Sequence, residues 1–273
     1  MVFTFGNRPL KRSHLLTAFL ACVVPLALGC SVFSTNDPTS PEEEVNQAVY
    51  LWSEELGEYD NSFIMSVLEA EGADRLILTA GKPASMEKAY ALQDTARSRG
   101  LTVEWLLAPN YWVQSDGTEE VAERLRPLDL RGSPLHLDIE PHAYDDFDEK
   151  EETYLRRYLQ VIREASRIIG DNKLMVSIPF FWPAETHKNI SEVVDRAYVM
   201  AYGDKSIDTR TEHARQATRH FQPSQRAVSL RPEDFSSMAA LQNQAIPSMR
   251  KSLGSNDFAL HDFEDIIESS DRN

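Results

Sequence analysis

Residues 134–142, with the sequence PLHLDIEPH, decide how the rest of the chain is interpreted. Apolar and polar residues alternate through most of this stretch, as they do in a strand whose two faces have different surroundings. His136, Asp138 and Glu140 would therefore share one face, with three aliphatic side chains on the other. Pro141 would end the strand and leave the Glu140 carboxylate at its C-terminal rim.

Strand-like apolar runs and helical stretches alternate on both sides of this segment, which is typical of parallel strands connected by helices. The expected strands cover residues 48–52, 74–79, 101–108, 135–140, 174–178, 197–202, 226–230 and 258–261. The expected helices cover residues 62–71, 85–99, 119–126, 151–169, a short stretch near 190, 211–220 and 236–251, and residues 263–267 are expected to form a closing segment. Eight strand–helix units in roughly 220 residues predict a single-domain α/β fold, the (β/α)8 TIM barrel. An open doubly wound sheet is the alternative, but no glycine-rich phosphate loop follows the first strand.

The composition is that of a soluble globular protein with a sizeable core. Of 273 residues, 42% are hydrophobic and 26% are charged. The formal net charge of -15 argues against nucleic acid or an anionic membrane surface as a partner. The two cysteines, Cys22 and Cys30, both precede the expected barrel, so the folded domain has neither an internal disulfide nor a thiolate metal site.

The N-terminus predicts export and lipid anchoring. Residues 1–29 combine a basic start with an apolar stretch too short to span a bilayer comfortably, as a signal peptide does. They lead into Ala-Leu-Gly-Cys30, which resembles the bacterial lipobox, so Cys30 is the expected lipidation site; ordinary secretion or an uncleaved anchor are the alternatives. Ser31 after the cysteine favours the outer membrane of the cell envelope. Residues 30–46 form the expected flexible tether and 47–273 the barrel.

Polar and aromatic residues follow several of the expected strands. In a barrel of parallel strands the C-terminal strand ends meet at one face, where barrel enzymes place their active sites. Asp138 and Glu140 are the strongest candidates, because the period of two places their Cβ atoms roughly 6–7 Å apart on one face. Two such acids cannot both ionise freely, so one pKa rises and that group can serve as a general acid. A buried polar pair satisfied by its barrel neighbours is the alternative interpretation.

Two short motifs resemble those of the family 18 glycoside hydrolases, the chitinases and related N-acetylglucosaminidases. That family carries D-x-x-D-x-D-x-E on its fourth strand and M-x-Y-D/N on its sixth. Here Asp138 and Glu140 end the fourth expected strand, and Met200 and Tyr202 end the sixth.

The chain departs from the family pattern at several positions. His136 and Ser133 stand at the two earlier aspartate positions of the first motif. Gly203 stands where the second motif has Asp or Asn, with Asp204 one place later. On the eighth strand His261 stands near the position at which the family usually has tryptophan. These departures affect the groups that assist the reaction more than the acid itself.

The resemblance implies a glycosidase of an extracellular or envelope polysaccharide that contains N-acetylhexosamine, with no cofactor and no metal. Glu140 would protonate the glycosidic oxygen, and Asp138 would orient the 2-acetamido group, whose oxygen attacks the anomeric carbon. Tyr202 would donate a hydrogen bond to that oxygen. The other residues expected to contact substrate are His136, Met200, Asp204 and His261.

The tryptophans are possible sugar-stacking platforms. Trp112 and Trp182, just past strand ends, are the best candidates, whereas core packing is the competing role for these two and for Trp52 and Trp105.

Three other functions fit parts of the pattern. A retaining glycosidase could use Glu140 with Glu233, which follows the seventh strand, as nucleophile. A metal hydrolase could use the histidines and acids of this face as ligands. A non-catalytic glycan-binding lipoprotein with a degenerate barrel would carry departures such as His136 and Gly203. The residues proposed for the metal scheme are His136, Asp138, Glu140, His142 and His261.

Overall fold

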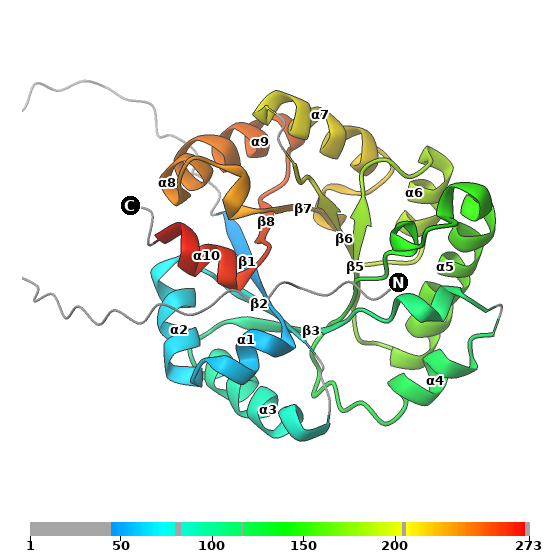
Figure 1. Cartoon of the computed structure of the whole chain (residues 1–273), viewed down its shortest axis with the longest axis horizontal. Coiled ribbons are helices and arrows are strands. Elements are labelled where there is room, and N and C mark those ends of the chain that lie inside the picture. The colour runs from blue at the N-terminus through cyan, green and yellow to red at the C-terminus, as the bar shows by residue number, and fades with distance from the viewer. Residues whose placement is uncertain (1–44, 80–82, 116, 204–205, 271–273) are drawn as a thin grey trace, which may run out of the picture. The chain divides into compact units, whose positions relative to one another are not determined.

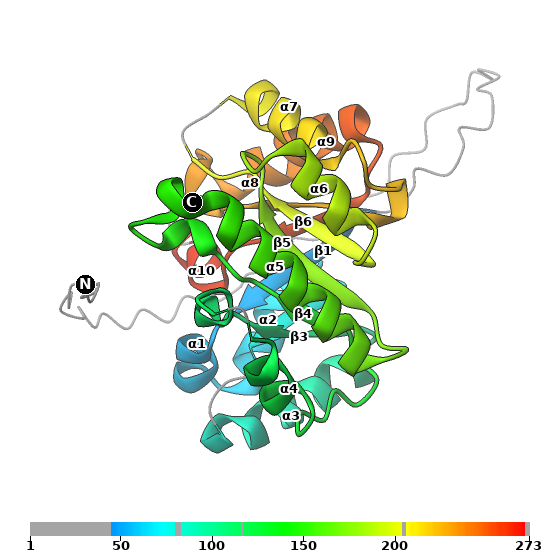
Figure 2. The same ribbon diagram turned by 90° about the vertical axis from the view of Figure 1, so that its right-hand side faces the viewer.

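A computed structural model describes residues 45–79, 83–115, 117–203 and 206–270. These residues lie within one compact unit, in which eight parallel strands close into a barrel in the order β1 to β8. Figure 1 shows the strands at the centre with the helices around them, and the turned view of Figure 2 shows the helices on the outside of the strands. The predicted single-domain (β/α)8 barrel is therefore confirmed. The predicted signal peptide and the predicted lipidation site Cys30 lie outside the described residues.

The elements follow the predicted order. The strands are β1 (Asn46–Leu51), β2 (Arg75–Thr79), β3 (Thr102–Leu107), β4 (Leu135–Leu137), β5 (Leu174–Pro179), β6 (Arg196–Met200), β7 (Arg226–Leu230) and β8 (Asp257–Leu260). The α-helices are α1 (Ser53–Glu58), α2 (Asn61–Ala70), α3 (Pro83–Ser98), α4 (Glu119–Leu125), α5 (Phe147–Ile169), α6 (Ala184–Ser191), α7 (Ile207–Thr218), α8 (Met238–Ala240), α9 (Ile246–Leu253) and α10 (Phe263–Ser270). Short 3-10 turns η1 (Asn110–Val113), η2 (Pro141–Ala143), η3 (Pro223–Gln225) and η4 (Pro232–Asp234) follow or precede strands.

Several details differ from the prediction. Helix α1 was not expected, and α5 begins earlier, at Phe147. The single helix expected over residues 236–251 is divided into α8, a π-helical turn η5 (Leu241–Ala245) and α9. Pro247, near the start of α9, has no N–H for a regular helical hydrogen bond, which explains why α9 begins anew there. Strand β4 ends at Leu137, although the Asp138 N–H still bonds the Leu107 carbonyl at 2.9 Å.

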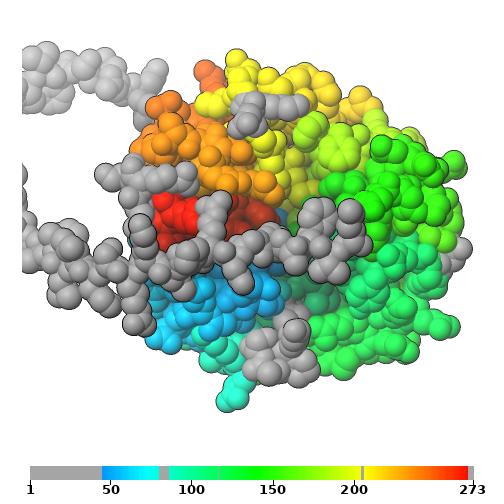
Figure 3. Space-filling view, in the orientation of Figure 1, coloured from blue at the N-terminus to red at the C-terminus, as the bar shows by residue number. Residues whose placement is uncertain are grey.

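The first and last elements of the barrel are neighbours. β1 pairs with β8 in parallel, and in the space-filling view of Figure 3 the red segment α10 lies between the blue N-terminal helices and the orange α8 region. In the part of the chain that the structure describes, every helix is too short or too polar to cross a lipid bilayer.

The alternation on β4 has the predicted two-sided surroundings. Leu135, Leu137 and Ile139 are buried in the large hydrophobic cluster between the strands and the helices. His136 faces the barrel interior, where its ring lies 4.9 Å from that of Tyr198 on β6. The period of two therefore assigned the two faces of this strand correctly.

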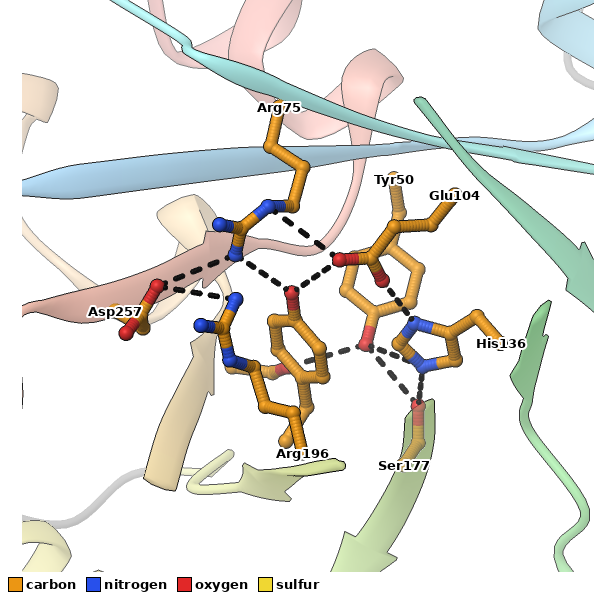
Figure 4. A network of polar contacts seen from close by, with 9 residues as sticks. Tyr50, Arg75, Glu104, His136, Ser177, Arg196 and Asp257 are labelled. Carbon is orange, nitrogen blue, oxygen red and sulfur yellow. Dashed lines mark hydrogen bonds and ion pairs between the residues drawn. The ribbon is translucent and has the colours of Figure 1, made fainter. Parts of the chain in front are cut away.

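The barrel interior is unusually polar for this fold, whose interior is generally filled with branched aliphatic residues. Glu104 on β3 is fully buried and accepts hydrogen bonds from His136 Nδ1 at 2.9 Å and from the Tyr198 hydroxyl at 2.8 Å. Arg75 lies 3.4 Å from Glu104 and 3.2 Å from Asp257, as Figure 4 shows. Because an isolated buried charge is very costly, these partners have to be present together.

We predict that Glu104→Ala destabilises the protein by about 3–5 kcal/mol, since it removes the acceptor of His136 Nδ1 and of the Tyr198 hydroxyl and leaves Arg75 with Asp257 as its ion-pair partner. Glu69→Ala is the matched control, because Glu69 pairs with Arg99 at an exposed site; it should cost about 0.5 kcal/mol or less. Urea denaturation at pH 7 measures both.

The dependence of stability on pH is a second test of the role of Glu104. The hydrogen bond from His136 and the charge of Arg75 hold the pKa of Glu104 below its usual value, although burial alone would raise it. Its stabilising contribution is therefore present at neutral pH and is lost as the pH falls below the ordinary carboxyl range. Equal losses in the two variants at pH 7 would contradict the central role of Glu104.

Candidate active site

A cavity of about 480 Å³ opens at the C-terminal ends of the strands. It lies where the barrel architecture places active sites, and it brings together residues that follow β1 and β3 to β8. The cavity is lined by Trp52, Ala108, Asn110, Asp138, Glu140, His142, Pro179, Phe180, Phe181, Met200, Tyr202, Arg231 and His261.

Asp138 and Glu140 both reach this cavity from the end of β4. Asp138 is only 6% exposed, and its Oδ1 atom has no hydrogen-bond partner among the described residues. Glu140 lies nearer the rim, and Asn110 Oδ1 accepts its backbone N–H at 2.7 Å. Since β4 pairs only as far as Leu137, this hydrogen bond fixes the chain beyond the last ladder residue.

The pKa of each carboxyl is raised. Burial is the main cause for Asp138, followed by the charge of Glu140, while a hydrogen bond with Ser177 acts in the opposite direction. Burial also raises the pKa of Glu140, and Arg231 opposes that effect. The pair therefore holds a proton at higher pH than ordinary carboxyls do. The sequence predicted a rise through mutual repulsion, whereas the structure identifies removal from water as the larger cause.

Tyr202, Arg231 and His261, which follow β6, β7 and β8, line another part of the cavity. The Arg231 guanidinium lies 4.6 Å from the centre of the Tyr202 ring, and the rings of Tyr202 and His261 are 5.4 Å apart. Burial raises the pKa of Tyr202, so its phenol keeps the proton that it could donate to a ligand. Burial lowers the pKa of His261, which favours the neutral imidazole. Met200 lines the floor next to these residues.

His142 also faces the cavity. Its Nε2 atom lies 3.8 Å from Glu140 Oε1, and its ring stands edge-on to Phe181 with the ring centres 5.3 Å apart. Burial lowers the pKa of His142, so this ring is neutral beside the acid at neutral pH. The sequence gave no reason to expect an inward orientation, because His142 follows Pro141.

Three residues expected to contact substrate do not line the cavity. His136 is fully buried beneath it. Trp112 and Trp182 are 1% and 3% exposed, and both belong to the hydrophobic core outside the strands. The chain turns back after β3 and β5 and carries these two indoles beneath the rim, which corrects their expected role as stacking platforms. Asp204 lies outside the described residues.

The aromatic wall is formed by other residues. Trp52 follows β1 and lines the cavity, as do Phe180 and Phe181 after β5. Phe181 is 55% exposed, which is uncommon for a large apolar side chain and leaves its ring available to a ligand. Trp105, in contrast, is fully buried in the core.

The structure does not bring together the residues that the retaining scheme and the metal scheme require. Glu233 lies in η4, half-exposed and 3.7 Å from Arg231, and it does not line the cavity. Among the described residues, no three His, Cys, Asp or Glu side chains are grouped so that they could hold a metal ion.

Sequence reasoning missed several residues that shape the site. Asn110, Phe181 and Arg231 each follow an expected strand within three residues, and His142, which was expected only as a metal ligand, does so too. Their signal was their position after a strand, but position alone does not say which way a side chain points once the strand has ended.

Comparison with solved structures shows similarity of fold. The catalytic domain of a chitinase from Pyrococcus furiosus superposes with a TM-score of 0.57 at 14% identity, covering 81% of this chain and 85% of that chain. A catalytic-site mutant of active domain 2 of the chitinase from the same organism gives 0.57 at 13% identity with the same coverage. A mutant complexed with chito-oligosaccharides gives 0.56 at 15% identity, covering 81% and 84%. No protein-family model and no curated protein sequence matches the chain.

Asp138→Asn should stabilise the protein at alkaline pH and not at acid pH. The raised pKa means that ionising Asp138 costs stability as the pH rises from about 4 through the folded-state value, and the amide never ionises. We expect a gain on the order of 2 kcal/mol at pH 8 that disappears near pH 4. Thermal denaturation measures it. Asp145→Asn, at an exposed position, is the control, and a gain of the same size there would contradict the prediction.

Proposed function

We propose that this protein is a glycoside hydrolase that cleaves a polysaccharide containing N-acetylhexosamine. Glu140 is the general acid that protonates the glycosidic oxygen. Asp138 orients the 2-acetamido group, and Tyr202 donates a hydrogen bond to the acetamido oxygen, which attacks the anomeric carbon. The observation that carries the proposal is the pair of carboxyls with raised pKa values, side by side in one cavity at the strand ends.

The side chains that line the cavity support a carbohydrate ligand. Aromatic rings of Trp52 and Phe181 offer apolar faces for a sugar ring, while Asn110 and Arg231 offer polar groups at the same opening. The similarity of fold to a chitinase domain that was crystallised with chito-oligosaccharides is consistent with this substrate class.

The orientation of Glu140 supports its role as acid. Its backbone is fixed by Asn110, its carboxyl is nearer the rim than that of Asp138, and neutral His142 lies beside it. A carboxyl that is deeper and more buried suits contact with the acetamido group, whereas the outer carboxyl suits contact with the leaving oxygen. The roles proposed for Asp138 and Glu140 therefore follow from how deep each carboxyl lies in the cavity.

Glu140→Gln should lower kcat/KM for a chromogenic chito-oligosaccharide by about 10²–10⁴-fold, because the amide cannot donate the proton that the leaving group needs. Glu233→Gln should leave kcat/KM unchanged. The release of chromophore measures both variants, and calorimetric titration measures binding.

The retaining glycosidase, the metal hydrolase and the glycan-binding protein each predict a different result when hydrolysis and binding are measured. A large loss in Glu233→Gln would favour the retaining scheme, and loss of activity with a chelator would favour the metal hydrolase. Oligosaccharide binding without cleavage by the unsubstituted protein would show a glycan-binding lipoprotein instead.

We also propose that the barrel is tethered to the bacterial cell envelope through a lipid on Cys30, in the outer membrane. The lipobox-like end of residues 1–29 and the position of both cysteines before the barrel support this. An outer-membrane site would place the cavity near envelope polysaccharide.

Replacing Cys30 by Ala should move the protein from the membrane fraction to the soluble fraction of cells, since the lipid chain is the proposed anchor. Fractionation with immunodetection measures the change. Cys22→Ala is the matched control and should leave the protein in the membrane fraction; release by both substitutions or by neither would contradict lipidation at Cys30.

A further inference from the structure

A cation lines the candidate active site. Ala227 and Ser229 on β7 lie on the inner side of the barrel, so the period of two directs Arg231, the next residue of that set, toward the mouth. Among the described residues that line the cavity, Arg231 is the only arginine or lysine. Burial lowers the pKa values of the two lining histidines, His142 and His261, so both are neutral at neutral pH. Arg231 therefore brings positive charge to a cavity that also holds two carboxyls.

The guanidinium of Arg231 is positioned but is not engaged in hydrogen bonds. Its Cζ lies 4.6 Å from the centre of the Tyr202 ring, and contact with a ring face leaves the N–H groups at the guanidinium edge open. Within the described part of the chain its one ion-pair partner is Glu233, with 3.7 Å between Nη1 and Oε1. That distance is too long for a direct hydrogen bond. The N–H donors of Arg231 are thus available to a ligand.

The turn after β7 holds Arg231 beside Tyr202. The Asp234 N–H donates to the Arg231 carbonyl at 3.2 Å, and Asp234 Oδ2 accepts the Gly203 N–H at 2.8 Å. These two hydrogen bonds join the turn after β7 to the segment after β6, which carries Tyr202. Arg231 is therefore in place before a ligand enters, and the ligand does not have to order it.

A neutral sugar would give the charge of Arg231 no counter-charge. A ligand that fills the cavity removes water from the guanidinium, and removing water from a charge is unfavourable unless new partners replace it. Sugar hydroxyls are neutral acceptors, whereas a carboxylate accepts two parallel charge-assisted hydrogen bonds from the planar guanidinium, each roughly twice as strong. The chemistry of Arg231 thus matches a ligand that carries a carboxylate.

We propose that Arg231 binds a carboxylate of the substrate, so that the preferred polymer is an acidic one, with a carboxylate on its N-acetylhexosamine units. The inference deepens the proposed function and rests on it for the identity of the sugar. Tyr202 supports the guanidinium on one face, and the edge of the guanidinium meets the ligand. Arg231 is a specificity-determining residue, which distinguishes an acidic amino-sugar polymer from a neutral chito-oligosaccharide.

The competing role for Arg231 is to act on its neighbours alone. Burial raises the pKa values of Glu140 and Tyr202, and the charge of Arg231 opposes both rises. That effect does not depend on the charge of the ligand. Replacing Arg231 would then change the binding of acidic and neutral saccharides by the same factor, so the comparison between ligands separates the two roles.

Calorimetric titration of the full chain carrying Glu140→Gln measures binding without cleavage. The ligands are three tetrasaccharides: one that alternates N-acetylglucosamine with N-acetylmuramic acid, which bears a carboxyl, the same molecule with its carboxyls converted to amides, and chitotetraose. At about 0.15 M salt the Debye length is about 8 Å, so distant charges of this acidic chain are largely screened. The acidic tetrasaccharide should bind about tenfold more tightly than either neutral one.

Arg231→Gln, added to the same chain, should reduce this preference to less than about twofold, because the charge-assisted pair is lost. The preference is a ratio of two affinities measured on one preparation, so a partly unfolded fraction does not alter it. Arg231→Lys should keep a preference of about threefold, since lysine retains the charge but lacks the planar fork. Arg99→Gln is the matched control, because Arg99 is an exposed arginine that also pairs with a glutamate; it should leave the preference intact.

Two results would overturn the inference: equal affinity for the acidic tetrasaccharide and its amide, or a preference that survives Arg231→Gln. An O-sulfated chitotetraose distinguishes the kinds of anion. Tighter binding of the sulfated ligand than of the acidic tetrasaccharide would overturn the assignment to a carboxylate.

Failure of the proposed function gives a different set of results. If the unsubstituted protein cleaves no tetrasaccharide but binds the acidic one preferentially, hydrolysis fails and recognition of the carboxylate stands. If it cleaves the acidic and neutral tetrasaccharides with equal kcat/KM, hydrolysis stands and the inference about Arg231 fails. If it binds none of them, both fail.

Discussion

The charge of Glu104 at the centre of the barrel is the constraint on which the interior depends. A carboxylate with no access to water needs donors on every side, and Arg75, Tyr198 and His136 supply them from three other strands. These side chains can meet only if the strands close with the observed register. The interior is therefore held by directional bonds at the level where other barrels of this kind use aliphatic layers.

The same constraint determines what lies beneath the candidate site. Because one nitrogen of His136 contacts Glu104, its other nitrogen is available to Ser177 on the neighbouring strand β5. A connected network of buried polar side chains thus lies beneath the cavity. A substitution in this network should alter the packing under the candidate site, although no ligand contacts the network itself.

The fold was predictable because it depends on patterns with a fixed period. Alternation placed His136 and Asp138 on the inner face of β4, and the eight repeats of strand and helix indicated closure. Side-chain orientation could not be predicted for residues that follow the end of a strand. Trp112 and Trp182 follow β3 and β5 closely, yet the turns after these strands direct both indoles into the core. A period of two carries no information about a turn.

The site was predictable to a similar extent. Asp138 and Glu140 could be paired from spacing alone, but the larger cause of their raised pKa values, burial, depends on how many side chains close over them. Arg231 was missed because folding brings it to the cavity that Glu140 lines, from a strand far away in the sequence, where its charge opposes the rise in the Glu140 pKa. A local sequence pattern cannot predict which residues of distant strands will lie beside a given side chain.

The hydrogen bond between Glu104 and His136 also has an evolutionary consequence. Glu104 and His136 come from neighbouring strands and satisfy one another in a place that water cannot enter. A lineage that exchanged only one of them would pass through a chain with a buried polar atom that lacks its hydrogen-bond partner, and with lower stability. The two positions should accordingly be inherited together, so that among descendants of this barrel they covary as strongly as any pair in the molecule.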